Sequence, residues 1–338
     1  MPLIEVDVEL SVKALEKLLD YTVDFLVEPL LGGWKARREV RATLIRALGE
    51  AQAEQILAVG KAIAEAKAQE IRARAEAPPG AALRLETVDL DRRTERNLER
   101  RLGNIAAIVD KARAALPAGD VPDVEPDVAW TSSFSSGAQG VSLEEMQELW
   151  ARVLAGEVAR KGTTSVKALS VLRELDQGTA ELFRRLCSMA ITRTGDDSLV
   201  VDSFVLSPGG DPGMNALEKF GVSFVDLSVL NEHGLIFSSY KIGDDYTTSI
   251  AAQTPQGWQA SQPFFYQGQE WVLIPERDPD QKFTVTGVLL SKAGREIANA
   301  IELETVPEYD QALKSYFTTH GLRMELVQSK SDAESDEL

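Results

Sequence analysis

Residues 141–157, VSLEEMQELWARVLAGE, constrain the fold most, because their apolar side chains repeat with the period of a helix. Ser142 stands where an N-cap is expected, and Glu145 three residues later completes a capping-box pattern. Five apolar positions spaced by three and four form one face: Met146, Leu149, Trp150, Val153 and Leu154. The stretch therefore predicts a helix with one buried face, and Gly156 near its end lets a neighbouring helix or turn approach closely.

The chain is long enough for more than one domain, because it has 338 residues and a single core rarely grows beyond about 250–300. Its hydrophobic content of 44% favours a folded protein. The most apolar stretch, residues 18–31, is interrupted by three acids and a proline, so no integral membrane segment is expected. With no leader-like N-terminus and Cys187 as the single cysteine, we expect a cytoplasmic protein without disulfides.

The N-terminal third predicts helices. Residues 1–33 hold a first helix, which ends near Pro29. Residues 34–76 contain no proline and are rich in alanine and charged residues, which predicts a helix of about 60 Å. A turn at 78–80 and a second helix from about residue 90 give it a partner, so residues 34–116 predict a long antiparallel helical hairpin of coiled-coil type.

Basic residues gather in this hairpin although the whole chain has a net charge of −17. From Trp34 to Arg113 there are 17 Lys and Arg against 12 Asp and Glu. The densest group comprises five candidate interaction residues: Arg92, Arg93, Arg96, Arg100 and Arg101. Overall acidity disfavours a protein that coats nucleic acid, so nucleic acid stays an alternative partner, and a solvated helical surface is the ordinary interpretation.

Residues 117–193 predict a central helical bundle entered through an acidic, proline-rich linker, which Trp130 and Phe134 should anchor. The helix at 141–157 is followed by one at 164–175 and by another that Asp176 caps. The expected core is apolar and aromatic: Trp150, Leu154, Leu169, Leu172, Leu182, Phe183 and Leu186.

Residues 194–327 predict an α+β domain, because β-branched and aromatic runs alternate there with turn residues and short helices. Expected elements include a strand at 199–206, helical segments within 215–232 and a helix capped by Ser291. The helix-then-strand order around residues 227–236 is typical of a winged helix, but the segment lacks Lys and Arg, which favours protein interaction over DNA recognition. Residues 328–338 predict a disordered acidic tail. The fold class is mainly α with a C-terminal α+β part.

Residue types suited to catalysis are scarce. His233 and His320 each precede glycine, as helix-end residues do, and Cys187 lies on an apolar helix face. The glycine-rich loop at 207–213 lacks the lysine of a phosphate-binding loop. We therefore assign no catalytic, cofactor-binding or metal-ligating residue and expect no cofactor.

Three side chains of the 141–157 helix are candidates for an interaction or structural role: Gln147, Trp150 and Glu157. Glu157 lies near the apolar face, where the ordinary interpretation is a capping or inter-helix hydrogen bond.

Three stretches resemble a bacterial family without established function, the domain of unknown function 2806 family: Asn104-Ile105 followed by KARAAL, residues 127–134, and VSLEEMQELWARVLAGE with TSVKALSVLRELDQGTAELFRRLC. The resemblance covers about residues 95–190. The family has an aspartate–tryptophan pair and a proline-glycine-serine turn. Here Asp127 precedes Trp130 by three residues and Lys161-Gly162-Thr163 replaces the turn, which suggests a divergent member. A distant similarity to abortive-infection proteins of the alpha type suggests antiphage defence, and neither resemblance implies catalytic residues.

The sequence thus favours a non-enzymatic interaction, scaffold or sensor protein in phage defence. We expect it to form a homo-oligomer or to bind a protein partner through the helical hairpin of residues 34–116, which we name the arm. The alternative is a nucleic-acid-binding regulator that uses the basic arm or the winged-helix-like domain. A hydrolase using carboxylates and a divalent metal has the least support.

Overall fold

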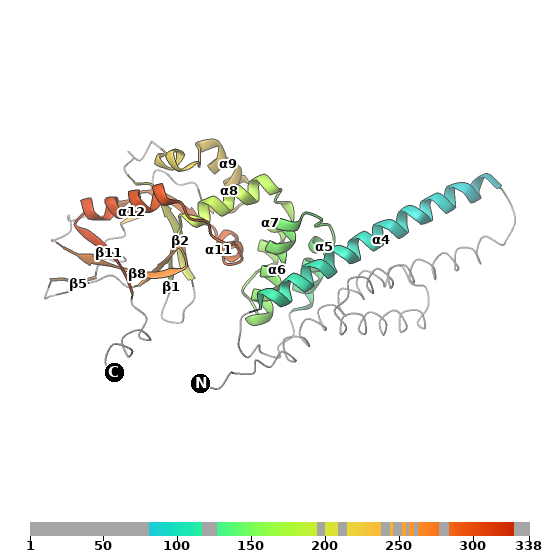
Figure 1. The fold of residues 1–338 in the computed structure, drawn as a ribbon, viewed down its shortest axis with the longest axis horizontal. Coiled ribbons are helices and arrows are strands. Elements are labelled where there is room, and N and C mark those ends of the chain that lie inside the picture. Colours follow the sequence, from blue (N-terminus) through green and yellow to red (C-terminus); the bar gives the residue numbers. More distant parts are fainter. Residues whose placement is uncertain are drawn as a thin grey trace, which may run out of the picture. The chain divides into compact units, whose positions relative to one another are not determined.

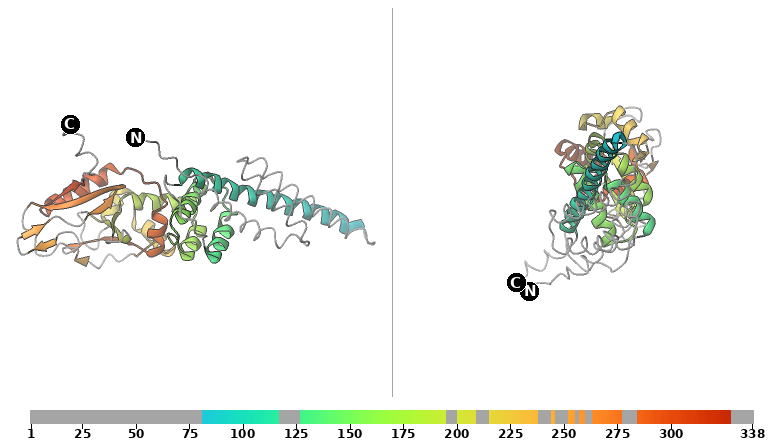
Figure 2. Two further views of the ribbon diagram at one scale, coloured as in Figure 1. Left: turned by 90° about the horizontal axis from the view of Figure 1, so that it is seen from below. Right: turned by 90° about the vertical axis from the view of Figure 1, so that its right-hand side faces the viewer.

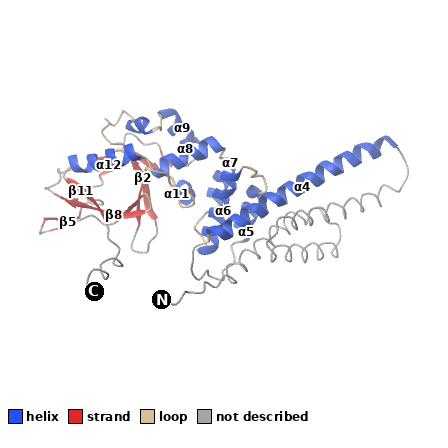
Figure 3. Ribbon diagram, in the orientation of Figure 1, coloured by secondary structure: helices blue, strands red, loops and turns tan. Residues whose placement is uncertain are grey.

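The computed structural model describes residues 81–116, 127–194, 200–208, 215–237, 244–245, 252–254, 257–259, 263–276 and 284–327. The helices predicted within residues 1–76, the turn at 78–80, most of the linker and the acidic tail lie outside the described residues. The chain divides into two compact units, Met1–Arg173 and Glu174–Leu338. Figure 3 shows that all the strands described belong to the second unit.

The described part of the first unit is helical. It contains α4 (Ala81–Ala115), α5 (Val128–Ala138), α6 (Glu144–Ala159) and α7 (Val166–Glu174). Helix α4 begins nine residues before the predicted position of about residue 90, and its 35 residues correspond to about 52 Å. Its buried positions form one stripe against α6 in its C-terminal part: Leu102, Asn104, Ile105, Ala106, Ile108, Val109 and Ala112.

Three aromatic rings form the centre of this unit. Trp130 stacks on Phe134 with ring centroids 5.1 Å apart, and Phe134 meets Trp150 edge-on at 5.3 Å. The first two rings lie on helix α5, where the sequence predicted only the end of a linker. Ser and Gly lower the helix propensity of this segment, so α5 depends on its buried aromatic face and on Asp127, which caps it by accepting from the Ala129 N–H at 2.8 Å.

Helix α6 confirms the predicted buried face but not the predicted cap. The helix begins at Glu144 after Leu143, and no side chain caps it. The Ser142 hydroxyl instead accepts a hydrogen bond from the Asn104 amide of α4 at 3.2 Å, so the capping-box prediction with Glu145 was wrong. Near the other end, a Cβ on Gly156 would lie 3.7 Å from the Thr163 hydroxyl, an ordinary van der Waals contact, so the following turn is a neighbour but does not require glycine here.

The described part of the second unit contains five helical elements: α8 (Gln177–Ser188), η1 (Ala216–Phe220), α9 (Phe224–Glu232), α11 (Lys292–Ala298) and α12 (Pro307–Thr319). Its main sheet has seven antiparallel strands in the order β11-β8-β7-β1-β2-β10-β3. Their bounds are β1 (Ile191–Thr194), β2 (Val200–Leu206), β3 (Ile236–Phe237), β7 (Phe264–Tyr266), β8 (Gln269–Pro275), β10 (Gly287–Leu290) and β11 (Leu322–Leu326). Two small pairs accompany it: β4 (Asp244–Asp245) with β9 (Thr284–Val285), and β5 (Ala252–Thr254) with β6 (Gly257–Gln259).

The helix caps and helix ends predicted from single residues in this unit are confirmed. Asp176 caps α8, Ser291 caps α11, and His233 and His320 stand at the ends of α9 and α12. The fold is therefore α+β here, as predicted, but seven of the described strands join one antiparallel sheet and a winged helix is not confirmed.

Helix α12 covers one face of this sheet, where its buried side chains Tyr309, Leu313 and Phe317 join the core (Figure 1). The ring of Tyr309 meets Phe220 edge-on at 5.1 Å, and its hydroxyl donates to the Leu206 carbonyl at 2.8 Å. Across both units, no described helix is long and apolar enough to cross a membrane.

Candidate functional site

The candidate residues of α6 are tied into the first unit. The Gln147 amide donates to the Val141 carbonyl at 3.0 Å and so closes the turn before the helix. Trp150 is completely buried. A Cβ on Gly137 of α5 would overlap the Trp150 ring, so the two helices meet where α5 lacks a side chain.

Glu157 organises the turn between α6 and α7. One carboxylate oxygen accepts from the Gly162 N–H at 2.8 Å, and the other accepts from the Thr163 hydroxyl and the Thr164 N–H, each at 3.1 Å. Its side chain is buried, with 4% exposure. These three bonds account for the buried charge, because a carboxylate without donors would be expensive in this position. Glu157 therefore has a structural role, in agreement with the ordinary interpretation.

The arginine candidates lie on α4, before its buried stripe. Arg96, Arg100 and Arg101 are exposed, and Arg100 contacts the neighbouring Asn97 at 3.4 Å. Arg92 and Arg93 lie on the same helix, but their side chains are outside the described part of the chain. Figure 1 and the left view of Figure 2 show this part of α4 extending past α5, α6 and α7. Residues 81–101 of α4 are the described part of the arm before the buried stripe, and at 1.5 Å per residue they are about 30 Å long.

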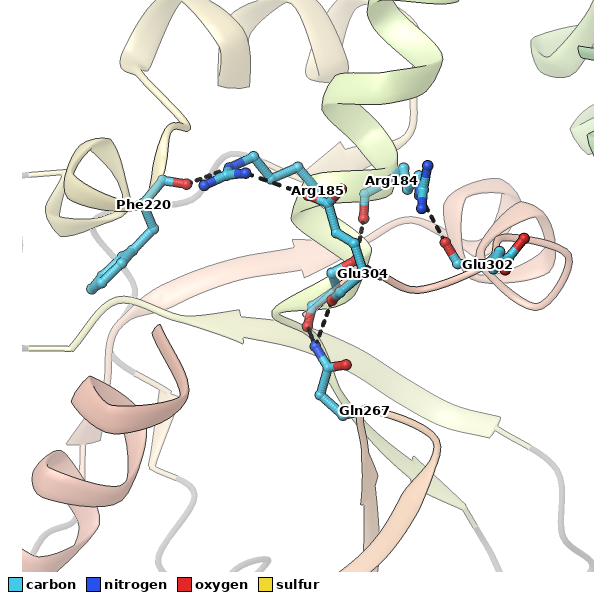
Figure 4. Close-up of polar contacts among 7 residues, drawn as sticks. Arg184, Arg185, Phe220, Gln267, Glu302 and Glu304 are labelled. Carbon is cyan, nitrogen blue, oxygen red and sulfur yellow. Dashed lines mark hydrogen bonds and ion pairs between the residues drawn. The ribbon is translucent and has the colours of Figure 1, made fainter. Parts of the chain in front are cut away.

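A polar network that the sequence did not predict lies at the end of α8 in the second unit (Figure 4). The Arg185 guanidinium donates to the Phe220 carbonyl at 2.6 Å and contacts the Glu304 carboxylate at 3.4 Å. Arg184 donates to the Glu302 carbonyl at 2.9 Å. The network thus fastens α8 to η1 and to the segment before α12.

Gln267 and Ser188 complete this network. The Gln267 amide donates to the backbone carbonyls of Ser188 and Glu304, the latter at 3.0 Å, and the Ser188 hydroxyl accepts from the Glu304 N–H at 3.0 Å. Gln267 has φ of +53° and Gly268 has φ of +70°, as a two-residue turn of type I′ requires between β7 and β8. Because these polar groups bind other groups of the same chain, the network positions elements and offers no reacting group.

Three groups of the second unit that could act as nucleophiles are buried: Cys187, Tyr266 and Tyr309. Burial raises the pKa of the Cys187 thiol, and it also raises the pKa of the Tyr266 and Tyr309 hydroxyls. A thiol held protonated is a poor nucleophile. In the described segments, no group of three or more His, Cys, Asp or Glu side chains is placed to hold a metal ion.

A family model described as "Protein of unknown function (DUF2806)" matches residues 90–314, from within α4 to within α12. The chain belongs to this family. The match confirms the resemblance on the 127–134 and 141–157 stretches, and it extends through most of the second unit. Neither the curated proteins nor the solved structures give a match to this DUF2806 chain.

Proposed function

We propose that this chain is a non-enzymatic interaction protein that binds a second copy or another protein through its helical arm. The observation that supports this function most directly is the construction of α4. Among the α4 side chains that the structure describes, the buried ones run from Leu102 to Ala112, whereas Arg96, Asn97, Arg100 and Arg101 are exposed. A helix of 35 residues whose described buried positions lie in its C-terminal part gains stability from a further packing partner along the rest of its length.

The preceding sequence supplies a suitable surface. Residues 34–76 carry the apolar stripe that predicts a second long helix, and coiled-coil-type packing of two such hairpins would form a helical interface between copies. The non-enzymatic part of the proposal rests on two reactive side chains that are hydrogen-bonded or buried inside the chain. Glu157 binds three donors of its own unit, and the Cys187 thiol is buried.

Size-exclusion chromatography with light scattering tests the arm. A chain lacking residues 34–95 should lose self-association while the remaining residues keep a cooperative thermal unfolding transition. The deletion stops before Leu102 because residues 102–112 belong to the core of the first unit. A matched control lacks only residues 328–338 and should form a particle with the same number of copies as the intact chain. If the chain lacking residues 34–95 forms a particle with the same number of copies as the intact chain, the proposal of a homo-oligomer through the arm is rejected.

The exposed arginines support a second candidate, binding of nucleic acid along the arm. Three positive side chains within six residues of a helix can follow a phosphate backbone. Replacing Arg96, Arg100 and Arg101 with Glu should abolish binding of a labelled duplex at 50 mM salt. The matched control replaces Arg160 and Lys161, two exposed basic residues of the same unit, and should bind as before. No anisotropy change with DNA or RNA at low salt would end this alternative.

The cellular location and the biological process are also part of the proposal. We infer a cytoplasmic protein from the single cysteine, and a role in antiphage defence from the similarity to abortive-infection proteins. A winged-helix-like use of the second unit would place the contact at α9, where Phe224 and Val225 are exposed beside Asp226. Phage plating on cells with and without the gene measures the defence role directly.

A further inference from the structure

Strand β11 forms one edge of the seven-stranded sheet. It pairs with β8, and no other described strand lies on its second side. Leu322 stands opposite Pro275, which has no N–H to donate. An edge strand of five residues with no described strand on its second side is a template for pairing with another strand.

The backbone bonds show which groups face the open side. The Glu276 N–H donates to the Gly321 carbonyl, and the Val327 N–H donates to the Glu270 carbonyl, both at 2.9 Å. Hydrogen-bonded pairs alternate along an antiparallel ladder, so the odd-numbered residues 321–327 bond to β8. The even-numbered residues therefore direct their N–H and C=O groups away from β8: Leu322, Met324 and Leu326.

The side chains along this edge alternate in the same way. Leu322 is buried, Met324 is half-buried and Leu326 is 46% exposed, all on one face of the strand. Arg323 and Glu325 point to the other face. Within the chain, Arg323 donates to the Glu276 carboxylate at 2.8 Å and also contacts Glu325. The edge thus has an apolar row and a row of two opposite charges.

We propose that β11 pairs antiparallel with β11 of a second copy of this chain, about a two-fold axis at Met324. In this register Arg323 of each copy faces Glu325 of the other copy. Leu322 faces Leu326, and Met324 faces its own equivalent. The two sheets then join into one continuous sheet.

Two independent features favour a second copy as the partner. The first is the direction of the backbone groups. About a two-fold axis at Met324, the even-numbered residues of the two strands face each other. Their N–H and C=O groups point outward, so they can form about six hydrogen bonds across the axis. The second is charge: the order Arg–x–Glu is self-complementary when the strand is reversed, whereas two like charges would repel each other. Pairing also covers Leu326. This interface is separate from the arm of the proposed function.

Charge reversal on the full-length chain tests the register. Arg323→Glu and Glu325→Arg each place like charges opposite each other twice in the dimer. Each should weaken the concentration-dependent association by about tenfold or more in sedimentation equilibrium at 50 mM salt. The double variant R323E/E325R restores opposite charges and should return to within about threefold of the unchanged chain.

A matched control separates this effect from the loss of the ion pair inside the chain. Glu276→Gln removes the charge that pairs with Arg323 inside the chain but leaves Arg323 and Glu325 in place, so association should be unchanged. Single variants that associate like the unchanged chain, or a double variant that stays as weak as the singles, would overturn the proposal. The arm is tested by deletion of residues 34–95. If only that deletion lowers the number of copies per particle, the β11 interface is rejected and the arm interface is supported. If only the β11 variants lower it, the arm interface is rejected and the β11 interface is supported.

Discussion

Glu157 and Trp130 bind the two sides of one residue, Thr164. The Thr164 N–H donates to the Glu157 carboxylate at 3.1 Å, and its carbonyl accepts from the Trp130 indole at 2.7 Å. The turn between α6 and α7 is therefore joined to α5 through a single peptide segment. Because all three residues are buried, these bonds are shielded from water.

Glu157→Ala should lower the free energy of unfolding by about 2–3 kcal/mol, because it leaves donors of the turn without their acceptor. Glu157→Gln should lower it by about 1–2 kcal/mol, since the amide nitrogen cannot accept. Urea unfolding measures both. The matched control is Glu145→Gln on the same helix, where the exposed side chain forms no cap and the change should be within about 0.5 kcal/mol. Equal effects at 145 and 157 would contradict the structural role of Glu157.

The shared residue also predicts coupling between Glu157→Gln and Trp130→Phe. The phenylalanine keeps an aromatic ring but loses the indole donor to the Thr164 carbonyl. Once either bond is lost the turn can relax, so the double variant should lose about 0.5–2 kcal/mol less than the sum of the single variants. A double-mutant cycle in urea measures this difference. Strict additivity would mean that the two bonds stabilise the chain independently.

The sequence predicted the elements whose signal is local. The apolar period of residues 146–154 gave α6, and the side chains of Asp176, Ser223 and Ser291 are ordinary N-caps, two of which were recognised. Helix α5 was missed because its stability comes from burying Trp130 and Phe134 rather than from helix propensity. Ser142 was assigned the wrong role because its bond to Asn104 spans 38 residues, which no local pattern shows.

The same limit applies to the candidate site. The family and the exposed arginines of α4 followed from short stretches of sequence. The network of Arg185, Gln267 and Glu304 joins residues up to 119 positions apart, so only the folded chain brings them together. Gln267-Gly268 could have been identified as a turn only if the positive φ of a glutamine had been expected.

Gly137→Ala should destabilise the first unit although alanine favours helices. The new Cβ would overlap the buried Trp150 ring, and overpacking of this kind costs about 1–3 kcal/mol. Trp150→Leu removes the ring, so Gly137→Ala should cost less in that background. Gly103→Ala is the matched control: it lies within α4 with nothing near its Cβ, and it should stabilise by about 0.5–1 kcal/mol. Chemical unfolding of the unchanged chain, the three single variants and the Gly137→Ala/Trp150→Leu double variant distinguishes steric overlap from helix propensity.

The stability supplied by Asp176 should depend on pH. Hydrogen bonds from the Thr179 N–H and hydroxyl lower the pKa of this carboxyl below its usual value of about 3.9. A lowered folded-state pKa means that the stabilisation is complete above the unfolded-state value and is lost as the pH falls through the folded-state value. The melting temperature of Asp176→Ala should therefore be below that of the unchanged chain at pH 6, with a gap that closes below about pH 4. Asp176→Asn should show a smaller gap, because its amide oxygen still caps α8.

Gln267 combines a stabilising network with an unfavourable backbone, and substitutions should separate the two. Gln267→Ala loses both amide bonds but keeps a Cβ at φ of +53°, so it should lower the unfolding free energy by about 1–2 kcal/mol. Gln267→Gly loses the same bonds, yet glycine adopts a positive φ without a steric penalty, so its loss should be smaller by about 0.5–1 kcal/mol. Gln269→Ala, an exposed substitution on β8, controls for general effects on the hairpin. If the glycine variant proves less stable than the alanine variant, the backbone at this turn is not strained, and the amide bonds of Gln267 serve only to hold α8 in place.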